Sequence, residues 1–207
     1  MNKIIKVLLS SIFCLSMLAG CSSSPYAKAE TQTLTIQGVP VYVEPDEDTT
    51  QNDVDTFLKY LKKQPEYLMK NCTGIYLQGE NQYYSYVGDS EAGQSSVGTA
   101  NPSDYSIHLL INNTKTLDRM TEYDITSSVT HELWHVFDFV NGVNGYYLSE
   151  LEFNVLYNQN PSSISEYSAT NVHEFFAEAG EMYIYSPEEL KEKNIDVYNY
   201  FESLPKE

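Results

Sequence analysis

The sequence His131-Glu132-Leu133-Trp134-His135 is the part of the chain that decides its fold. It has the form H-E-x-x-H, and on a helix its two histidines project from one face and can bind the same metal ion. Glu132 stands beside that face, where a carboxylate can take a proton from a metal-activated water. The pattern therefore predicts a helix that carries a catalytic metal site, with a third ligand supplied from elsewhere in the chain.

The motif helix is predicted over residues 126–140, and Asn141-Gly142 ends it. At 100° per residue, one stripe of the helix is apolar and the opposite side carries His131, His135 and Asp138. A polar stripe on a long apolar helix indicates a cleft, and the alternative is a simple solvated face. The apolar stripe consists of Val129, Leu133, Val136 and Val140.

The third ligand has two candidates, on a later helix predicted over residues 170–185. The metzincin pattern is excluded, because Asn141 stands where its third histidine would be. In the gluzincin class the third ligand is a glutamate on a later helix, which favours Glu174, and His173 is the competing candidate. Glu178 shares a face with Glu174 and could accept the outer N–H of a ligand histidine. Asp138 could do the same or brace its helix, although any of these acids could also be merely solvated.

A family resemblance adds to this interpretation. The pattern Tyr167-(x)6-Glu174-Phe175-Phe176-Ala177-Glu178, following H-E-x-x-H and Asp138, resembles the catalytic domain of the anthrax lethal factor family of gluzincin-type zinc metallopeptidases. In size and layout the chain is similar to the small secreted Pro-Pro endopeptidases of that fold. The resemblance covers the two motif helices and, more loosely, residues 34–207.

The resemblance implies a zincin-like α+β fold with one zinc ion per chain, held by His131, His135 and Glu174. It implies that Glu132 is the general base, that the hydroxyl of Tyr167 stabilises the tetrahedral oxyanion, and that Glu178 lies behind the ligands. Two departures leave a preference for proline-rich targets open. His173 replaces an acidic residue, and the only tryptophan of the chain, Trp134, lies in the metal motif and not in the loop over residues 88–102.

Strands are predicted early in the chain and helices late, which is typical of an α+β domain with a small N-terminal mixed sheet and a helical C-terminal half. A Ser149–Glu152 capping box is expected to open one of the helices. The predicted strands lie within residues 34–43, 73–77, 83–87, 95–100 and 106–111, and the predicted helices span residues 53–64, 126–140, 170–185 and 196–204, with shorter ones beginning near residues 149 and 186.

An edge strand beside the motif helix would bind a peptide as an additional strand. Residues 95–100 and 105–111 are the alternatives, and the first is favoured because Gly98 permits close approach of a backbone. Gly98, Thr99, Ala100 and His173 are therefore the candidate substrate contacts. Tyr83, Tyr84 and Tyr86 either line a subsite or pack in a strand, and His108 is expected to be structural.

The N-terminus has the features of an export signal. Residues 1–20 hold a basic start and a short apolar stretch, and Leu18-Ala19-Gly20-Cys21 resembles the bacterial lipobox. This predicts cleavage before Cys21, a lipid anchor on that cysteine, a flexible tether over residues 21–33 and a metallopeptidase domain over residues 34–207. The alternative is an ordinary secreted protein in which Cys21 has no such role.

Charge and cysteine content narrow the partners. Loss of Lys3 and Lys6 with the signal changes the formal net charge from −17 to −19, which argues against nucleic acid and against charge-driven binding to anionic membranes. Cys14 would leave with the signal and Cys21 would carry the lipid, so Cys72 would have no cysteine partner, and we expect it to be a small buried hydrophobe rather than a nucleophile. A monomer is expected.

The sequence thus predicts a zinc-dependent endopeptidase of protein substrates, exported and anchored outside the bacterial membrane. Two alternatives remain, a catalytically silent zincin-fold binding lipoprotein and a metal-scavenging lipoprotein. The presence of Glu132 argues against the first alternative, because binding zinc does not require it, and a metal scavenger would favour a histidine-rich acidic loop. The chain also contains only four histidines, and none of them form a histidine-rich loop.

Overall fold

The structure of the protein is a computed structural model that describes residues 27–88, 96–111 and 122–206, without the side chains of residues 122–124. The predicted signal, its cleavage site and Cys21 lie outside the described residues. The folded chain begins earlier than residue 34, the predicted domain boundary. Ala29 is buried, and its backbone N–H donates to the carbonyl of Thr49.

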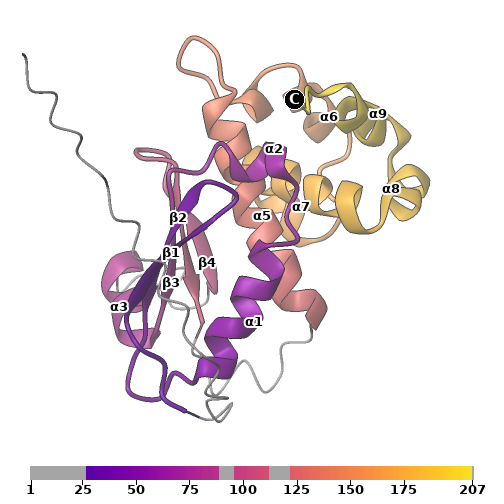
Figure 1. Cartoon of the computed structure of the whole chain (residues 1–207). Coiled ribbons are helices and arrows are strands. Elements are labelled where there is room, and N and C mark those ends of the chain that lie inside the picture. Colours follow the sequence, from indigo (N-terminus) through magenta and orange to yellow (C-terminus); the bar gives the residue numbers. More distant parts are fainter. Residues whose placement is uncertain (1–26, 89–95, 112–121, 207) are drawn as a thin grey trace, which may run out of the picture.

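A five-stranded mixed sheet forms the N-terminal part, with the strand order β1-β2-β3-β5-β4. The hairpin β1–β2 and the pair β4–β5 are antiparallel, whereas β2–β3 and β3–β5 are parallel. The strands span Gln32–Ile36 (β1), Val39–Glu44 (β2), Gly74–Gln78 (β3), Gly98–Ala100 (β4) and Ser106–Leu110 (β5). Figure 1 shows the sheet on one side of the molecule and most of the later helices on the other.

The helices follow the α+β order that the sequence predicts. They are α1 (Gln51–Leu61), α2 (Glu66–Met69), α3 (Glu80–Val87), α5 (Glu122–Val140), α6 (Phe153–Gln159), α7 (Val172–Tyr185), α8 (Pro187–Lys193) and α9 (Ile195–Ser203), with two 3-10 turns, η1 (Leu148–Glu150) and η2 (Tyr167–Thr170). Within the described ranges no helix is long and apolar enough to cross a membrane.

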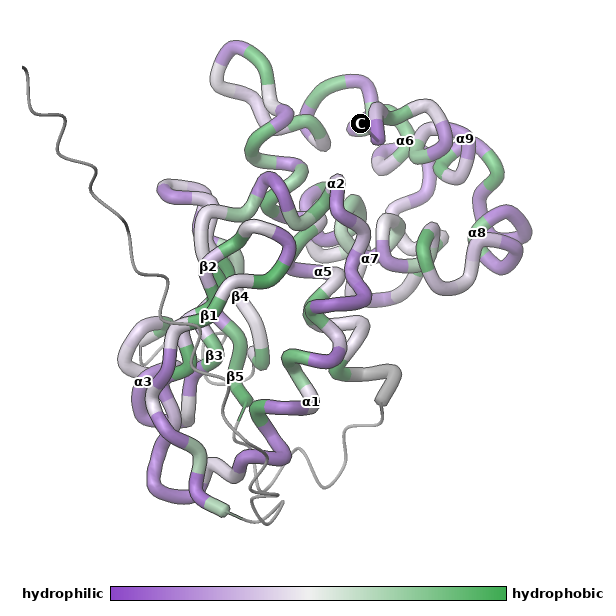
Figure 2. The backbone as a smooth tube through the Cα atoms, viewed as in Figure 1, coloured by the Kyte–Doolittle hydropathy of each residue, from purple (hydrophilic) through white to green (hydrophobic). Residues whose placement is uncertain are grey.

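The alternation of side chains along the strands decides which face of the sheet is the core face. Every second residue of the three central strands is fully buried, and these residues join α1 and α5 in one hydrophobic cluster. The opposite face carries the polar and aromatic residues Tyr42, Tyr76 and His108, and α3 packs there against β3 and β5. Figure 2 shows the apolar strands and the more polar outer turns of α8. The six of these residues with no exposed surface are Val41, Val43, Ile75, Leu77, Ile107 and Leu109.

Helices α5 and α7 pack closely because a glycine lies at their contact. A Cβ atom at Gly180 would stand 2.5 Å from Cδ2 of Trp134, whose ring is almost fully buried. The Trp134 ring also packs against Phe176 of α7 and Phe201 of α9. This contact sets the spacing of the two helices that carry the H-E-x-x-H motif and Glu174.

Two local predictions were wrong. Residues 83–87 form the end of helix α3 and not a strand. The carboxylate of Asp46 accepts a hydrogen bond from the N–H of Asn81 in the first turn of this helix, and the helix buries the side chain of Tyr83. The capping box predicted at Ser149 is also absent. Glu150 reaches back to the N–H of Tyr147 instead, and the hydroxyl of Ser149 donates to Asp138.

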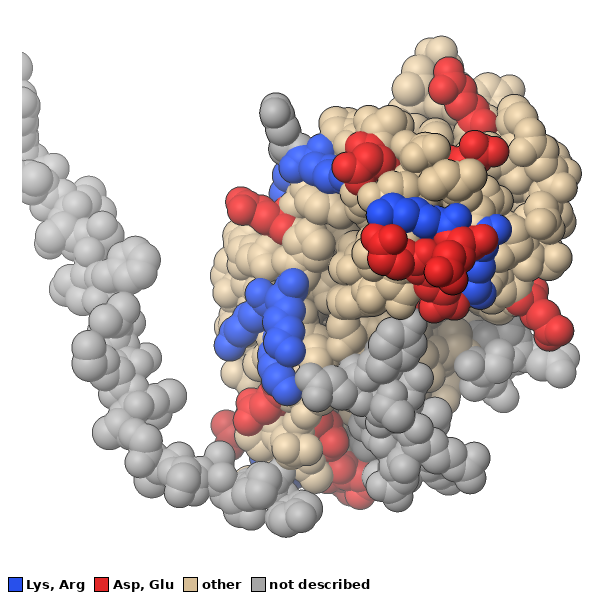
Figure 3. Space-filling view, turned by 90° about the vertical axis from the view of Figure 1, so that its right-hand side faces the viewer, with Lys and Arg blue, Asp and Glu red and all other residues tan. Residues whose placement is uncertain are grey.

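Acidic and basic side chains alternate on the helical end of the molecule. Figure 3 faces the side on which α8 lies in Figure 1, and lysines and acidic side chains lie next to one another there. Pairs one helical turn apart account for this, including Lys191 with Glu188 and Lys193 with Glu189. Exposed pairs of this kind contribute little to stability.

Candidate metal centre

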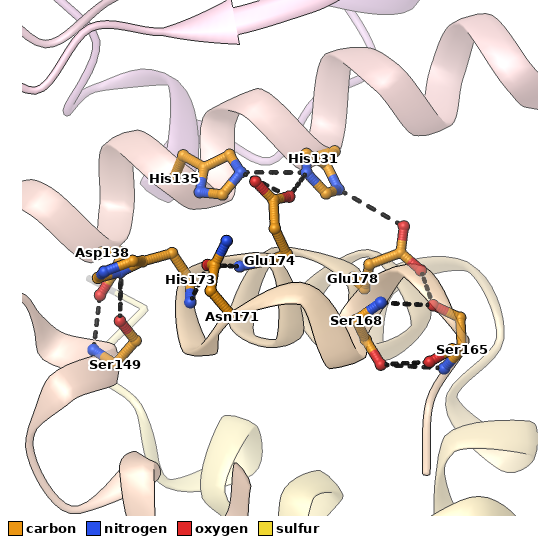
Figure 4. Close-up of polar contacts among 10 residues, drawn as sticks. All are labelled: His131, His135, Asp138, Ser149, Ser165, Ser168, Asn171, His173, Glu174 and Glu178. Atoms are coloured by element: carbon orange, nitrogen blue, oxygen red, sulfur yellow. Dashed lines mark hydrogen bonds and ion pairs between the residues drawn. The ribbon is translucent and has the colours of Figure 1, made fainter. Parts of the chain in front are cut away.

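Helices α5 and α7 bring three candidate metal ligands to one point. Nε2 of His131 lies 3.1 Å from Nε2 of His135, and Oε2 of Glu174 lies 2.9 Å from the first and 3.3 Å from the second. Ligands about 2.1 Å from a tetrahedral ion stand about 3.4 Å apart, so these separations fit a metal ion with little movement. Figure 4 shows the two imidazoles and the carboxylate converging from facing helices. The cluster is therefore compatible with a metal ion.

The charged groups of the cluster shift one another's pKa values. Burial lowers the pKa of His131, but its hydrogen bond with Glu174 and the charges of Glu132, Glu174 and Glu178 outweigh burial and raise the pKa to about 9. Burial raises the pKa of Glu174, but its hydrogen bonds with His131 and His135 hold that pKa well below the usual range. The side chains of His131, His135 and Glu174 thus meet at a point where a positive charge is favoured.

Glu132 is a buried carboxylate next to His131 on helix α5. It is 8% exposed, and burial raises its pKa, while the charges of His135 and His131 oppose that rise. Its carboxylate accepts a hydrogen bond from the backbone N–H of Ala100 in β4. A Cβ atom at Gly98 would stand 2.8 Å from Oε1 of Glu132, so glycine is required for β4 to lie this close.

Strand β4 is the outer edge of the sheet, as the preferred alternative predicted. Val97 and Asn101 form backbone hydrogen bonds with β5. Because pairing directions alternate along an antiparallel strand, the polar groups of Gly98 and Ala100 face away from β5. The N–H of Ala100 is used by Glu132. The carbonyl of Ala100 and the backbone N–H and carbonyl of Gly98 therefore remain as the polar groups that face the open edge of the sheet.

Tyr167 lies in η2, beside the two ligand helices. Its side chain is 55% exposed, its ring centroid is 6.1 Å from that of His131, and its hydroxyl forms a hydrogen bond with Glu174. Burial, followed by the Glu174 charge, raises the pKa of Tyr167, so the phenol stays protonated and available as a donor. The resemblance placed this residue in the site, and the structure brings it there.

Glu178 stands behind His131, although at a longer range than a hydrogen bond. Its Oε1 lies 3.8 Å from Nδ1 of His131, and its Oε2 accepts a 2.8 Å hydrogen bond from Ser165. Nδ1 of His135 has no hydrogen-bond partner among the described residues, so Asp138 does not serve it.

Asp138 instead links α5 to η1 and α7 through hydrogen bonds. Its carboxylate is fully buried and accepts bonds from the N–H of Ser149 at 2.6 Å, the hydroxyl of Ser149 at 2.7 Å and Nδ1 of His173 at 3.0 Å. Figure 4 shows this network to one side of the three-ligand cluster. The structure thus removes His173 from competition with Glu174, because its Nδ1 faces Asp138 and Ser149.

A cavity of about 510 Å³ opens over the cluster. All four candidate substrate contacts, Gly98, Thr99, Ala100 and His173, lie in its walls. Sequence reasoning missed Asn171 and Tyr147, which also line it, as does Phe139, which flanks the histidine face of the motif helix. Phe139 stacks on His135, which a helical spacing of four residues would have suggested. A smaller hollow of about 160 Å³ shares Gly98, His131 and Glu132 with this cavity and is also lined by Tyr167, Glu178 and Glu181, among others.

The remaining aromatic candidates divide between the core and the cavity. Tyr83 is fully buried and bonds Ser96, so it packs internally, whereas Tyr86 lines the larger cavity. His108 is buried between the rings of Tyr76 and Tyr86, at centroid distances of 4.4 and 3.5 Å, as expected for a structural residue. Cys72 is buried as well, and burial raises the pKa of its thiol to about 11.

Residues 146–204 match the family model of the glucose-regulated metallo-peptidases M90. The matched part holds Tyr167 and Glu174 but begins after the H-E-x-x-H motif, and it covers less than half of the chain. The similarity points to a metallopeptidase. The candidate metal centre agrees with that class, with Glu174 inside the matched part and His131 and His135 outside it. No curated protein matches the chain.

Proposed function

We propose that the protein is a zinc-dependent endopeptidase of protein substrates, of the anthrax lethal factor type. One observation carries the proposal. The buried carboxylate of Glu132 lies beside the His131, His135 and Glu174 cluster, in the wall of the same cavity. Two imidazoles and one carboxylate are one of the donor sets of catalytic zinc sites, which keep one position open. The similarity to a metallopeptidase family supports the reaction class.

The peptide would lie along β4 as an additional strand, held by the outward backbone groups of Gly98 and Ala100, with Thr99 and His173 in the same cavity. A zinc ion, when bound, activates the attacking water and polarises the scissile carbonyl. Glu132 takes the proton of that water and delivers it to the leaving amine. The hydroxyl of Tyr167 donates a hydrogen bond to the charge that develops on the carbonyl oxygen.

The test is cleavage of a diverse peptide library by the zinc-loaded protein, read by mass spectrometry, beside Glu132→Gln. We expect cuts by the wild type only, with zinc content equal in the two proteins. Removing a general base lowers the rate about 10²- to 10⁴-fold. Equal patterns from the two proteins, with zinc bound in each, would refute the peptidase and favour a catalytically silent binding lipoprotein. Cuts between prolines would define proline-rich targets.

We further propose that the protein is exported and held on the outer face of the bacterial membrane by lipid on Cys21, as a monomer. The support is the Leu18-Ala19-Gly20-Cys21 sequence after a basic and apolar start. Labelled palmitate should enter the wild type and Cys72→Ala but not Cys21→Ala. Export of an unlabelled wild type would instead indicate a secreted protein.

A further inference from the structure

The side chain of Asn171 has one polar end committed and one polar end free. Its Oδ1 caps α7 by accepting hydrogen bonds from the backbone N–H groups of His173, at 2.9 Å, and Glu174, at 3.0 Å. Two N–H donors can be met only by the oxygen of the carboxamide, so the orientation of the amide is fixed by its partners. The Nδ2 group must therefore point the other way.

The free end of Asn171 belongs to the larger cavity. Asn171 lines that cavity with Glu174 and His173, and the structure gives its Nδ2 no partner among the described residues. In Figure 4 this nitrogen is directed away from the start of α7, towards the side on which His135 and Glu174 lie. A donor with two N–H groups is thus held rigidly beside the candidate metal centre.

A peptide bound along β4 would present such a donor with a partner. One edge of the added strand pairs with Gly98 and Ala100, and its other edge carries carbonyls and N–H groups that β4 cannot reach. Buried carbonyls of this kind need a donor. The start of α7 lines the cavity together with β4, and Asn171 is a side chain there whose donor end is free.

We propose that Asn171 is a substrate-binding residue, whose Nδ2 donates to a main-chain carbonyl of the bound peptide on the edge that faces away from β4. This rests on the proposed function. The same side chain caps α7 and so aligns Glu174, which couples the metal ligand and the peptide contact to one residue. Because Asn171 would contact a main-chain carbonyl, it would bind peptides irrespective of their side chains.

The variant Asn171→Ser separates the two roles. Serine keeps an oxygen that caps a helix as well as asparagine does, but its short hydroxyl lacks the amide donor. We expect KM for a library-derived peptide to rise about 3- to 10-fold, with kcat, zinc affinity and Tm unchanged. Asn171→Asp, which also keeps the cap, should raise KM at least as much, and Asn171→Ala should lower Tm as well.

Asn194→Ser is the control, because Asn194 caps α9 by accepting the N–H of Val197, donates its Nδ2 to Ser163 and does not line the cavity. Its KM should equal that of the wild type. An unchanged KM in Asn171→Ser would overturn the proposal. A fall in its zinc affinity and kcat with KM unchanged would also overturn it, and would show that Asn171 acts only through Glu174.

Binding of the same peptides to the zinc-loaded Glu132→Gln protein separates this proposal from the proposed function. Suppose that the wild type cleaves nothing, but Glu132→Gln binds a peptide and Asn171→Ser in that background weakens binding about 3- to 10-fold. The peptidase would then be refuted and the Asn171 contact supported. Peptides in which one amide at a time is an alkene isostere would identify the carbonyl, since the effect of Asn171→Ser should vanish for that peptide.

Discussion

The backbone of Gly98 lies against the carboxylate of Glu132, so that a Cβ atom on Gly98 would stand 2.8 Å from Oε1 and 2.9 Å from Cγ. The same carboxylate accepts the N–H of Ala100. The edge strand therefore fixes the position of the proposed general base from two sides. In the proposed mechanism, one three-residue strand thus sets both substrate pairing and proton transfer.

We predict that Gly98→Ala displaces Glu132 and lowers kcat/KM about 10- to 100-fold, since a misplacement of about 1 Å costs this much. Zinc content and Tm should change little, because the added methyl faces a side chain and not the core. The control is Gly74→Ala in β3, where the nearest atom to a new Cβ lies 3.4 Å away. Wild-type kinetics in Gly98→Ala would mean that Glu132 has room to move.

Tyr167→Phe should lower kcat about 10²- to 10³-fold with little change in zinc affinity, because it removes one donor to the oxyanion. The phenol bonds Glu174 in the structure, so a small change in the metal site is expected as well. Tyr146→Phe is a suitable control, since Tyr146 is similarly exposed. Equal losses of zinc and of activity in Tyr167→Phe would assign the hydroxyl to Glu174 alone.

The sequence predicted that the candidate metal ligands come together because most of its signals are local. A spacing of four residues on one helix places His131 beside His135, and the helical spacing of Glu174 and Glu178 places them on one face of α7. The choice of Glu174 over His173 was not local. It depends on how α7 is rotated against α5, which the contact between Gly180 and Trp134 and the bonds to Asp138 settle.

The errors of prediction have a similar origin. Residues 83–87 are rich in tyrosine, which favours strands, but tertiary contacts override this preference and make α3 helical. Ser149 has the spacing of a helix cap, yet a buried carboxylate eleven residues earlier in the chain takes its hydroxyl. Asn171 was missed because a capping asparagine looks the same whether or not its amide end faces a cavity.

Asp138→Asn should lower the free energy of unfolding by about 1–3 kcal/mol, since an amide cannot accept all three donated bonds at a fully buried site. Urea unfolding of the metal-free protein measures this change. Asp104→Asn is the matched control. Asp104 also accepts the N–H and hydroxyl of a serine, Ser106, but is exposed, so its replacement should cost less than about 0.5 kcal/mol.

Gly180→Ala tests the packing of α5 on α7 through the sign of its effect. In an exposed helix this change would stabilise by about 0.5–1 kcal/mol. Here the new Cβ would meet three atoms of the buried Trp134 ring within 2.6 Å, so we expect a loss of about 1–3 kcal/mol in urea unfolding, with a shift in tryptophan fluorescence. A gain in stability would show that the two helices separate easily.

His108 should make the sheet sensitive to acid. It is 5% exposed, and burial lowers its pKa to about 4, although the charge of Asp104 opposes this. In the unfolded chain the pKa is about 6.5, so below that pH the unfolded state binds a proton that the folded state refuses. Stability is therefore complete above pH 6.5 and falls as the pH drops towards 4.

The measurement is urea unfolding of the metal-free wild type and His108→Gln between pH 7.5 and 4.5. Glutamine does not titrate, and the other ionisable groups are common to the two proteins, so the difference between them isolates His108. The stability of the wild type relative to His108→Gln should fall by about 2–3 kcal/mol over this range. A constant difference would mean that the imidazole takes up a proton in the folded protein, which would require Tyr76, Tyr86 or Gln78 to move away from it.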